Sequence, residues 1–160
     1  DGLERHSNIG FGGGGLIAAC CSALAVSEAG RISVSGPEVI ETHRGIEEFD
    51  SRDRALVWRT TGGKHRWLCG SAERFVDDSI GAFREAALAL LAHHAAAGLD
   101  SLLREQARLE RRLVRFGDCD DALHIWRAMG AGLPAALPEL DYAGFMEQGA
   151  PIREASDDAR

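Results

Sequence analysis

The sequence lacks a long apolar run, and its few cysteines show no metal-binding pattern. No hydrophobic stretch approaches the roughly 18 residues that a membrane-spanning helix needs, so we expect no membrane span. The four cysteines are Cys20, Cys21, Cys69 and Cys119, and they form no Cys-x-x-Cys pair. Zinc sites need His or Cys at ligand spacing, which the chain does not offer. We therefore expect free, buried thiols, no metal and a cytoplasmic location.

Basic charge is also scarce. The 18 Lys and Arg residues are outnumbered by 25 Asp and Glu residues, giving a net charge of -7. Proteins that bind nucleic acid usually carry a basic surplus, so nucleic acid is not an expected partner. The N-terminal stretch DGLERHSNIG has the pattern of neither a signal peptide nor a transit peptide. With 160 residues, 45% of them hydrophobic, the chain predicts a single domain over residues 1–160.

Strand signals are few and lie near the start, whereas helix signals dominate the end. Short buried strands are predicted at 23–26 and 31–35, and a sheet this small needs further strands from elsewhere. Glycines, prolines and N-cap residues delimit the predicted helices. These are 15–24, one beginning at Pro37, 52–61 (capped by Asp50 or Ser51), 80–98 (capped by Ser79), 102–117 (capped by Asp100 or Ser101, stopped at Gly117) and 119–129. The segment 64–79 reads as a turn or strand followed by one helical turn. The Gly- and Pro-rich tail, 131–160, is expected to wrap a neighbour or to fray.

Four consecutive glycines, Gly12–Gly15, precede the first apolar helix. With Gly10 and the later Glu28 they match the Gly-x-Gly-x-x-Gly pattern of dinucleotide-binding proteins. Polar residues rather than an apolar strand precede Gly10, and the following helix is short for that fold, so the match is weak. No lysine follows the loop, which excludes a Walker A phosphate loop.

The same glycines are suited to an oxyanion hole. Backbone N–H groups at a helix start, unshielded by Cβ atoms, can donate to an acyl oxygen as that oxygen gains negative charge. A glycine turn required only for close packing remains the alternative.

Longer motifs carry a resemblance to a known family. The segment GRISVSGPEVIE, after a glycine-rich loop and a small-residue helix, resembles the carboxyltransferase branch of the crotonase superfamily. The segments SGPEVIE, EEFDSRDRALVWRTTGGKHR and VDD resemble the beta subunits of biotin-independent malonate decarboxylases, over about Gly10 to Leu91 and more loosely beyond. The resemblance implies an α/β, crotonase-like (ClpP/crotonase) domain. This chain would carry its C-terminal part, and the family's N-terminal half would be absent.

The resemblance also implies an activity. Malonyl-thioester on an acyl carrier protein would be converted to acetyl-thioester and CO2 without biotin. A gamma subunit would supply the facing half of a hetero-oligomer, and the thioester would be held on an arm derived from dephospho-coenzyme A. Loss of CO2 leaves an enolate, so such a site needs oxyanion donors rather than a nucleophile.

Site residues follow from that chemistry. We expect Gly13 and Gly14 to donate N–H groups to the thioester oxygen, and Ser35 and Gly36 to line the carboxylate end. The remaining substrate-binding candidates are Gly12 and Gly15 in the loop, and Lys64, His65 and Arg66 as a basic cluster for the phosphates of the arm. A solvated turn is the alternative for that basic cluster.

Other interpretations stay open. The nearest enzymatic one is a biotin-dependent acyl-CoA carboxyltransferase subunit, which shares the enolate chemistry. A non-catalytic structural subunit is another. The predicted helix over 102–117 gathers five arginines on one face: Arg104, Arg108, Arg111, Arg112 and Arg115. This face either docks an acidic carrier protein or pairs with Glu105 and Glu110 along the helix.

Overall fold

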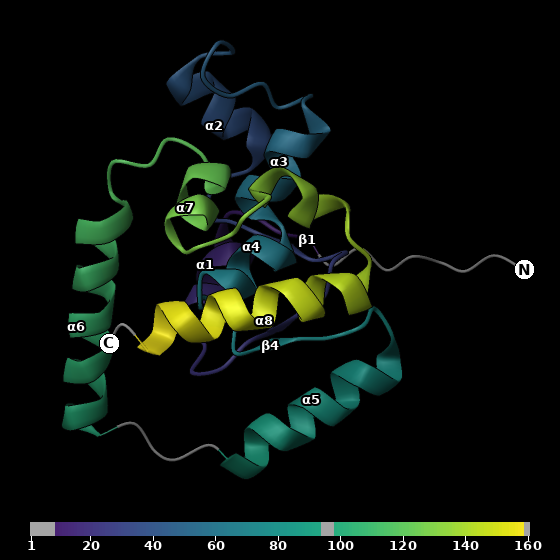
Figure 1. Cartoon of the computed structure of the whole chain (residues 1–160), viewed down its shortest axis with the longest axis vertical. Coiled ribbons are helices and arrows are strands. Elements are labelled where there is room, and N and C mark those ends of the chain that lie inside the picture. The colour runs from purple at the N-terminus through teal and green to yellow at the C-terminus, as the bar shows by residue number, and fades with distance from the viewer. Residues whose placement is uncertain (1–8, 94–97, 159–160) are drawn as a thin grey trace, which may run out of the picture.

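The computed structural model describes residues 9–93 and 98–158, which form a mainly helical α/β body (Figure 1). Within these ranges the strands pair in two parallel sets, β1 (Ile9–Gly10) with β3 (Arg31–Ile32) and β2 (Ala25–Val26) with β4 (Arg74–Phe75). The few early strands and the later helices agree with the sequence prediction, although each strand has only two residues.

A central helix organises the rest. The helices, in chain order, are α1 (Gly13–Ala19), α2 (Pro37–Arg44), α3 (Arg54–Thr61), α4 (Gly63–Leu68), α5 (Ile80–His93), α6 (Leu99–Phe116), α7 (Ala122–Ala128), the 3-10 helix η1 (Pro134–Glu139) and α8 (Tyr142–Asp158). Helix α4 lies in the middle and contacts α3, α8, β2, β3 and β4, whereas α5 and α6 lie at the edges (Figure 1). None of the helices over the described residues is long and apolar enough to cross a membrane.

Aromatic side chains from distant segments build the core around α4. Trp126 of α7 and Phe145 of α8 are 1% and 0% exposed, and Trp67 of α4 is also buried. The ring of Phe145 lies 5.7 Å from Trp67 and 4.9 Å from Phe75. Aromatic pairs at such distances add to the stability gained from burial alone, so the core joins α4, β4 and α8 into one unit.

Local capping signals fix several helix starts. The Ser79 hydroxyl accepts a hydrogen bond from Ala82 N (3.2 Å) at the start of α5, as predicted. The start of α3 is capped by Asp53, which accepts from Leu56 N, rather than by Asp50 or Ser51. For α6 the N-cap is Gly98 rather than Asp100 or Ser101. The predicted passage of the preceding helix through 94–97 lies outside the described residues.

Two predictions of secondary structure are wrong. The segment expected as a turn or strand after Gly63 is α4, a buried helix. The tail expected to wrap a neighbour or to fray forms η1 and α8 over residues 134–158, with Leu137 and Phe145 in the core. Hydrophobic burial outweighs the effect of the internal Pro151 on α8.

Candidate functional site

Two helix N-termini lie side by side at one edge of the first strand pair. Strands β1 and β3 are parallel, with Gly10 opposite Ile32, and the backbone N–H of Ser33 donates to Gly10 O at 3.1 Å. Each strand leads directly into a helix, β1 into α1 and β3 into α2. A Cβ atom built on Gly36 would lie 3.7 Å from the Phe11 ring, so the two connecting loops touch. This edge therefore combines the partial positive charges of two helix starts.

The glycine loop is open on one side and closed on the other. Gly12, Gly13 and Gly14 are exposed, and Cβ atoms built on them would meet nothing within 4 Å. Gly12 has a φ of 60°, a conformation that glycine adopts easily, and it caps α1. Gly13 and Gly14 occupy the first turn of α1, where a helix leaves its N–H groups without intrahelical acceptors. These amides can donate to an oxygen atom from outside the chain.

Gly15 has a different task. It is buried, and a Cβ atom there would lie 2.0 Å from Ser33 O and 2.8 Å from Gly10 O. Only glycine allows α1 to pack this closely on the two strand ends. Gly15 therefore positions the exposed part of the loop and is itself covered.

Ser35, Gly36 and Glu38 stand at the start of α2. Gly36 is the N-cap, Ser35 precedes it and both are half-buried. Pro37 takes the first helical position, which it favours because it needs no hydrogen-bond acceptor there. Glu38 brings a carboxylate oxygen to 3.7 Å from the Cβ position of Gly36, where the helix dipole stabilises it. The structure thus places Gly12–Gly14 and Ser35–Gly36 near one edge, and the roles assigned to them stay predictions.

The predicted basic cluster is dispersed by α4. The Lys64 ammonium donates to Pro138 O (2.9 Å) and to Leu140 O, while Arg66 Nε donates to Ile32 O (2.9 Å). These side chains therefore hold backbone carbonyls of η1 and β3 instead of sharing one surface, and the solvated turn considered as an alternative is wrong. A contact with phosphate remains a prediction.

Burial controls the protonation of this region. Burial, and then the charges of Arg66 and Arg112, lowers the pKa of His65 to about 3. Burial also lowers the pKa of Lys64 and raises the pKa of the Cys69 thiol, whose sulfur lies 3.6 Å from His65 Nδ1. At neutral pH His65 is an uncharged core side chain packed near Trp126.

Exposed apolar side chains on the elements that flank the glycine loop, which we call the apolar rim, are a feature that the sequence analysis missed. Its side chains are exposed large hydrophobics from β1, α1, the β3–α2 connection and α2: Ile9, Leu16, Ile17, Val34 and Val39. The adjacent large apolar residues Leu16 and Ile17, directly after the glycines, were the signal in the sequence. Exposed Cys20 and Cys21 at the end of α1 likewise correct the prediction of buried thiols, although all four cysteines are free.

The described residues contain no group of three or more His, Cys, Asp or Glu placed to hold a metal. The dinucleotide interpretation gains one feature and loses another. A short strand, β1, does precede the loop, but α1 has only seven residues and Glu28 lies 3.8 Å from the Lys64 ammonium. A ribose would have to compete for that carboxylate.

Known proteins with similar sequence or structure come from malonate metabolism. No protein-family model matches the chain. Over 145 residues it is 36% identical to the malonyl-S-ACP:biotin-protein carboxyltransferase MADC of Malonomonas rubra, a match covering 86% of the chain and 45% of that protein. A chain of the Pseudomonas malonate decarboxylase hetero-tetramer in complex with malonate matches with a TM-score of 0.61 and 34% identity, over 76% of this chain and 45% of that one. A chain of the Pseudomonas MdcD-MdcE hetero-dimer matches with a TM-score of 0.47 and 28% identity, over 69% and 44%.

The chain is therefore related to carboxyltransferase components of malonate decarboxylases. It spans less than half the length of these relatives.

Proposed function

We propose that the chain is a component of a malonate decarboxylase that converts malonyl-thioester on an acyl carrier protein to acetyl-thioester and CO2. The observation that carries the proposal is the pair of open amides of Gly13 and Gly14, at a helix start beside the start of α2. In this proposal the residues belong to the C-terminal part of a crotonase-like domain. A gamma subunit supplies the facing half, and the substrate arm comes from the carrier protein, with no biotin.

The chemistry needs charge stabilisation more than covalent catalysis. As the bond between the carboxylate carbon and the α-carbon breaks, its electron pair moves toward the thioester carbonyl, and the oxygen becomes an enolate oxyanion. The N–H groups of Gly13 and Gly14 donate to that oxygen, and a proton then adds to the α-carbon. Preorganised donors of this kind stabilise developing charge strongly where water is excluded.

The surrounding residues orient the substrate. Ser35 and Gly36 line the carboxylate end, Gly12 turns the chain into α1, and Gly15 anchors it. The apolar rim, with Leu16 54% and Ile17 70% exposed, gives the departing carboxylate poorly hydrating surroundings. Contact of Lys64, His65 and Arg66 with the arm phosphates is a separate proposal, which requires Lys64 and Arg66 to exchange the backbone carbonyls that they now hold.

A proline substitution tests the oxyanion role. Gly13 is the first residue of α1, a position where proline is well accepted, so Gly13→Pro removes the N–H group and keeps the helix. Gly13→Ala keeps the N–H group and is the matched control. In the assembled complex we expect kcat to fall by about 10²–10³ in Gly13→Pro alone. Equal activity of the two variants would mean that the loop serves only in packing, and would favour a structural subunit without a catalytic role.

Transfer of the carboxyl group to biotin is the second candidate function, because MADC is named as a carboxyltransferase to a biotin protein. Both reactions share the enolate, so the fate of the CO2 unit separates them. Malonyl-loaded carrier protein is incubated with the complex in the presence of avidin. CO2 release that continues supports decarboxylation, whereas release that needs free biotin protein supports transfer.

A further inference from the structure

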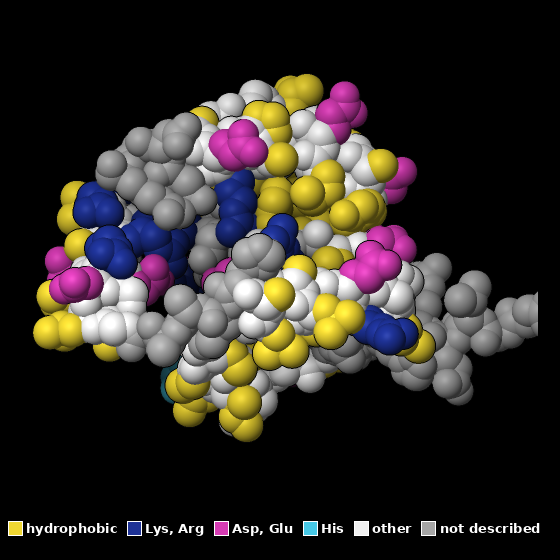
Figure 2. All heavy atoms as spheres, turned by 90° about the horizontal axis from the view of Figure 1, so that it is seen from below, with side chains coloured by type: hydrophobic (Ala, Val, Ile, Leu, Met, Phe, Trp, Pro, Cys, Tyr) yellow, Lys and Arg dark blue, Asp and Glu magenta, His cyan; other side chains and the backbone are white. Residues whose placement is uncertain are grey.

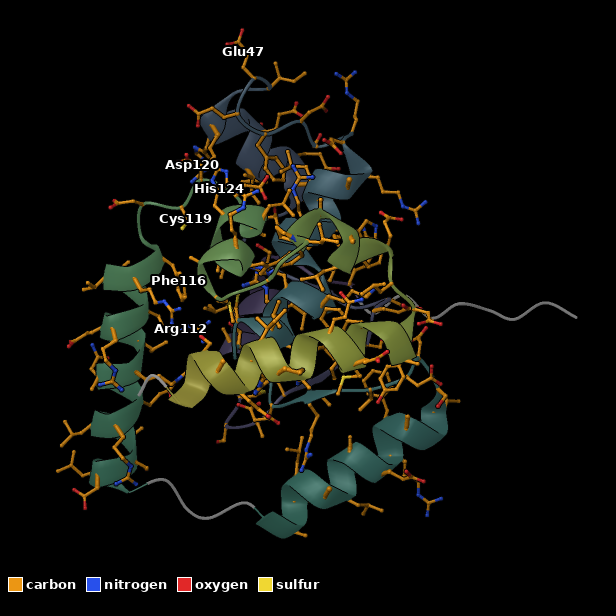
Figure 3. All side chains as sticks on the ribbon, in the orientation of Figure 1. Glu47, Arg112, Phe116, Cys119, Asp120 and His124 are labelled. Atoms are coloured by element: carbon orange, nitrogen blue, oxygen red, sulfur yellow. The ribbon has the colours of Figure 1, made fainter. Side chains whose placement is uncertain are left out.

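Helix α6 is attached to the body through its arginine face. Arg108 Nη2 lies 3.5 Å from Gly70 O, and Arg115 Nη2 donates to Ala128 O at 2.8 Å. Arg112 Nη1 lies 2.8 Å from where a Cβ atom of Gly70 would be, so this guanidinium also sits on the Gly70 turn. Figure 3 shows Arg112 and Phe116 projecting from α6 toward the body. The face considered for carrier docking is thus partly occupied by the chain itself.

The opposite face of α6 is apolar and exposed. Amphipathic helices normally bury their apolar face, yet α6 has no buried residue. We call the exposed side chains of this face the leucine stripe: Leu99, Leu102, Leu103, Leu109, Leu113 and Val114, which are 48–87% exposed. Figure 2 looks along α6, at the left, and shows hydrophobic side chains on its outer edge and Lys and Arg on its inner side.

The stripe has the spacing of a helix-pairing seam. Leu99, Leu102, Leu109 and Leu113 alternate at three- and four-residue steps with Gln106, which is the a/d pattern of a coiled coil with one polar position. A seam of this kind fits one further helix. Turning α6 to bury the stripe against its own body would withdraw the arginines from the backbone oxygens of Gly70 and Ala128.

Charge points to a different chain rather than a second copy. Gln106 Nε2 donates to Glu110 Oε1 at 3.0 Å, which places a carboxylate beside the middle of the stripe. In a parallel pair of α6 helices, Glu110 would face Glu105 of the other copy, and like charges repel there. In an antiparallel pair of α6 helices, Glu105 of one copy would face Arg112 of the other. Arg112 already lies against the Gly70 turn of its own chain, so this pairing would compete with that contact.

We propose that the leucine stripe docks an amphipathic helix of another subunit, with an a/d apolar seam and a Lys or Arg opposite Glu110. This inference rests on the proposed function only in naming that subunit as a partner in the decarboxylase complex. The relative solved as part of a hetero-tetramer supports such a partner.

Three substitutions test the stripe. Leu102→Ser, Leu109→Ser and Leu113→Ser are combined, and Leu133→Ser is the control at a site 75% exposed but away from α6. Because the stripe faces solvent, circular dichroism of the chain should not change. We expect association with the partner subunit, measured by sedimentation without substrate, to weaken at least about tenfold in the triple variant alone. Unchanged association would overturn the proposal.

Charge reversal tests the identity of the occupant. Glu110→Lys should weaken association with the partner subunit, whereas Glu85→Lys on exposed α5 should not. If the wild-type chain instead forms a homodimer that the triple variant converts to monomers, a second copy is the occupant and the proposal is overturned. Association is measured separately from CO2 release. The docking proposal can therefore be tested even if the catalytic proposal fails.

Discussion

The carbonyl oxygen of Ser33 lies 2.0 Å from the position that a Cβ atom of Gly15 would take. This approach holds the first turn of α1 against the end of β3, and so places the glycine loop beside the start of α2. A methyl group here must displace backbone, because no flexible side-chain end is available to move aside. The geometry of the loop therefore requires glycine at position 15, because a Cβ atom there would collide with the Ser33 carbonyl.

Gly15→Ala should destabilise the protein, whereas Gly14→Ala should not. The first change overpacks a backbone contact, at a cost of about 1–3 kcal/mol or more. The second adds a methyl group where nothing lies within 4 Å, at a helical position where alanine is favoured over glycine. Urea unfolding of both variants measures the difference. Equal stability of the two would contradict the close packing of α1 on β3.

Lys64, the only lysine in the chain, should prove structural in a stability measurement. Lys64→Met leaves the carbonyl groups of Pro138 and Leu140 without their donor, which should cost about 1–3 kcal/mol. Arg52→Met is the control, since the Arg52 side chain is 77% exposed in its pair with Asp50. Thermal unfolding gives the comparison. Unchanged stability with a raised KM for the carrier protein would instead support the phosphate role.

His65 should make stability fall in mild acid. Its pKa of about 3 in the folded chain lies below the ordinary value of 6.5, so between these values the unfolded chain binds the proton more readily. The contribution of His65 is complete above about pH 6.5 and declines as pH drops toward 3, by up to about 1.4 kcal/mol per pH unit. His65→Gln should flatten this dependence in urea titrations at pH 5 and 7. His124→Gln, a substitution of a histidine that is exposed, is the matched control.

Features set by local sequence were predictable. Pro37 at the first position of α2, Ser79 capping α5 and Gly117 ending α6 all act within one turn of the chain. The glycine loop and the start of α2 were assigned to one site by the family resemblance and its chemistry, because the polar residues before Gly10 gave no sign of β1.

Features set by tertiary contacts were not predictable. Gly62 and Gly63 read as a helix stop, and α3 does end at Thr61. The sequence did not show that α4 begins at Gly63, where a Cβ atom would meet Ser27 O at 2.0 Å. The Pro- and Gly-rich tail gave no sign that Phe145 completes the core. Helix periodicity located the arginines of α6 on one face, but which face turns inward depends on carbonyl groups at Gly70 and Ala128, far away in the sequence.

The burial of Phe145 between Trp67 and Phe75 also has a consequence during synthesis on the ribosome. Both strand pairs are parallel and so cannot form as hairpins, and β2 can pair with β4 only after the intervening β3 and α2–α4 have been synthesised. The nascent polypeptide must keep Trp67 and Phe75 uncovered until translation has passed α8. During that interval these rings are exposed to chaperones and to aggregation.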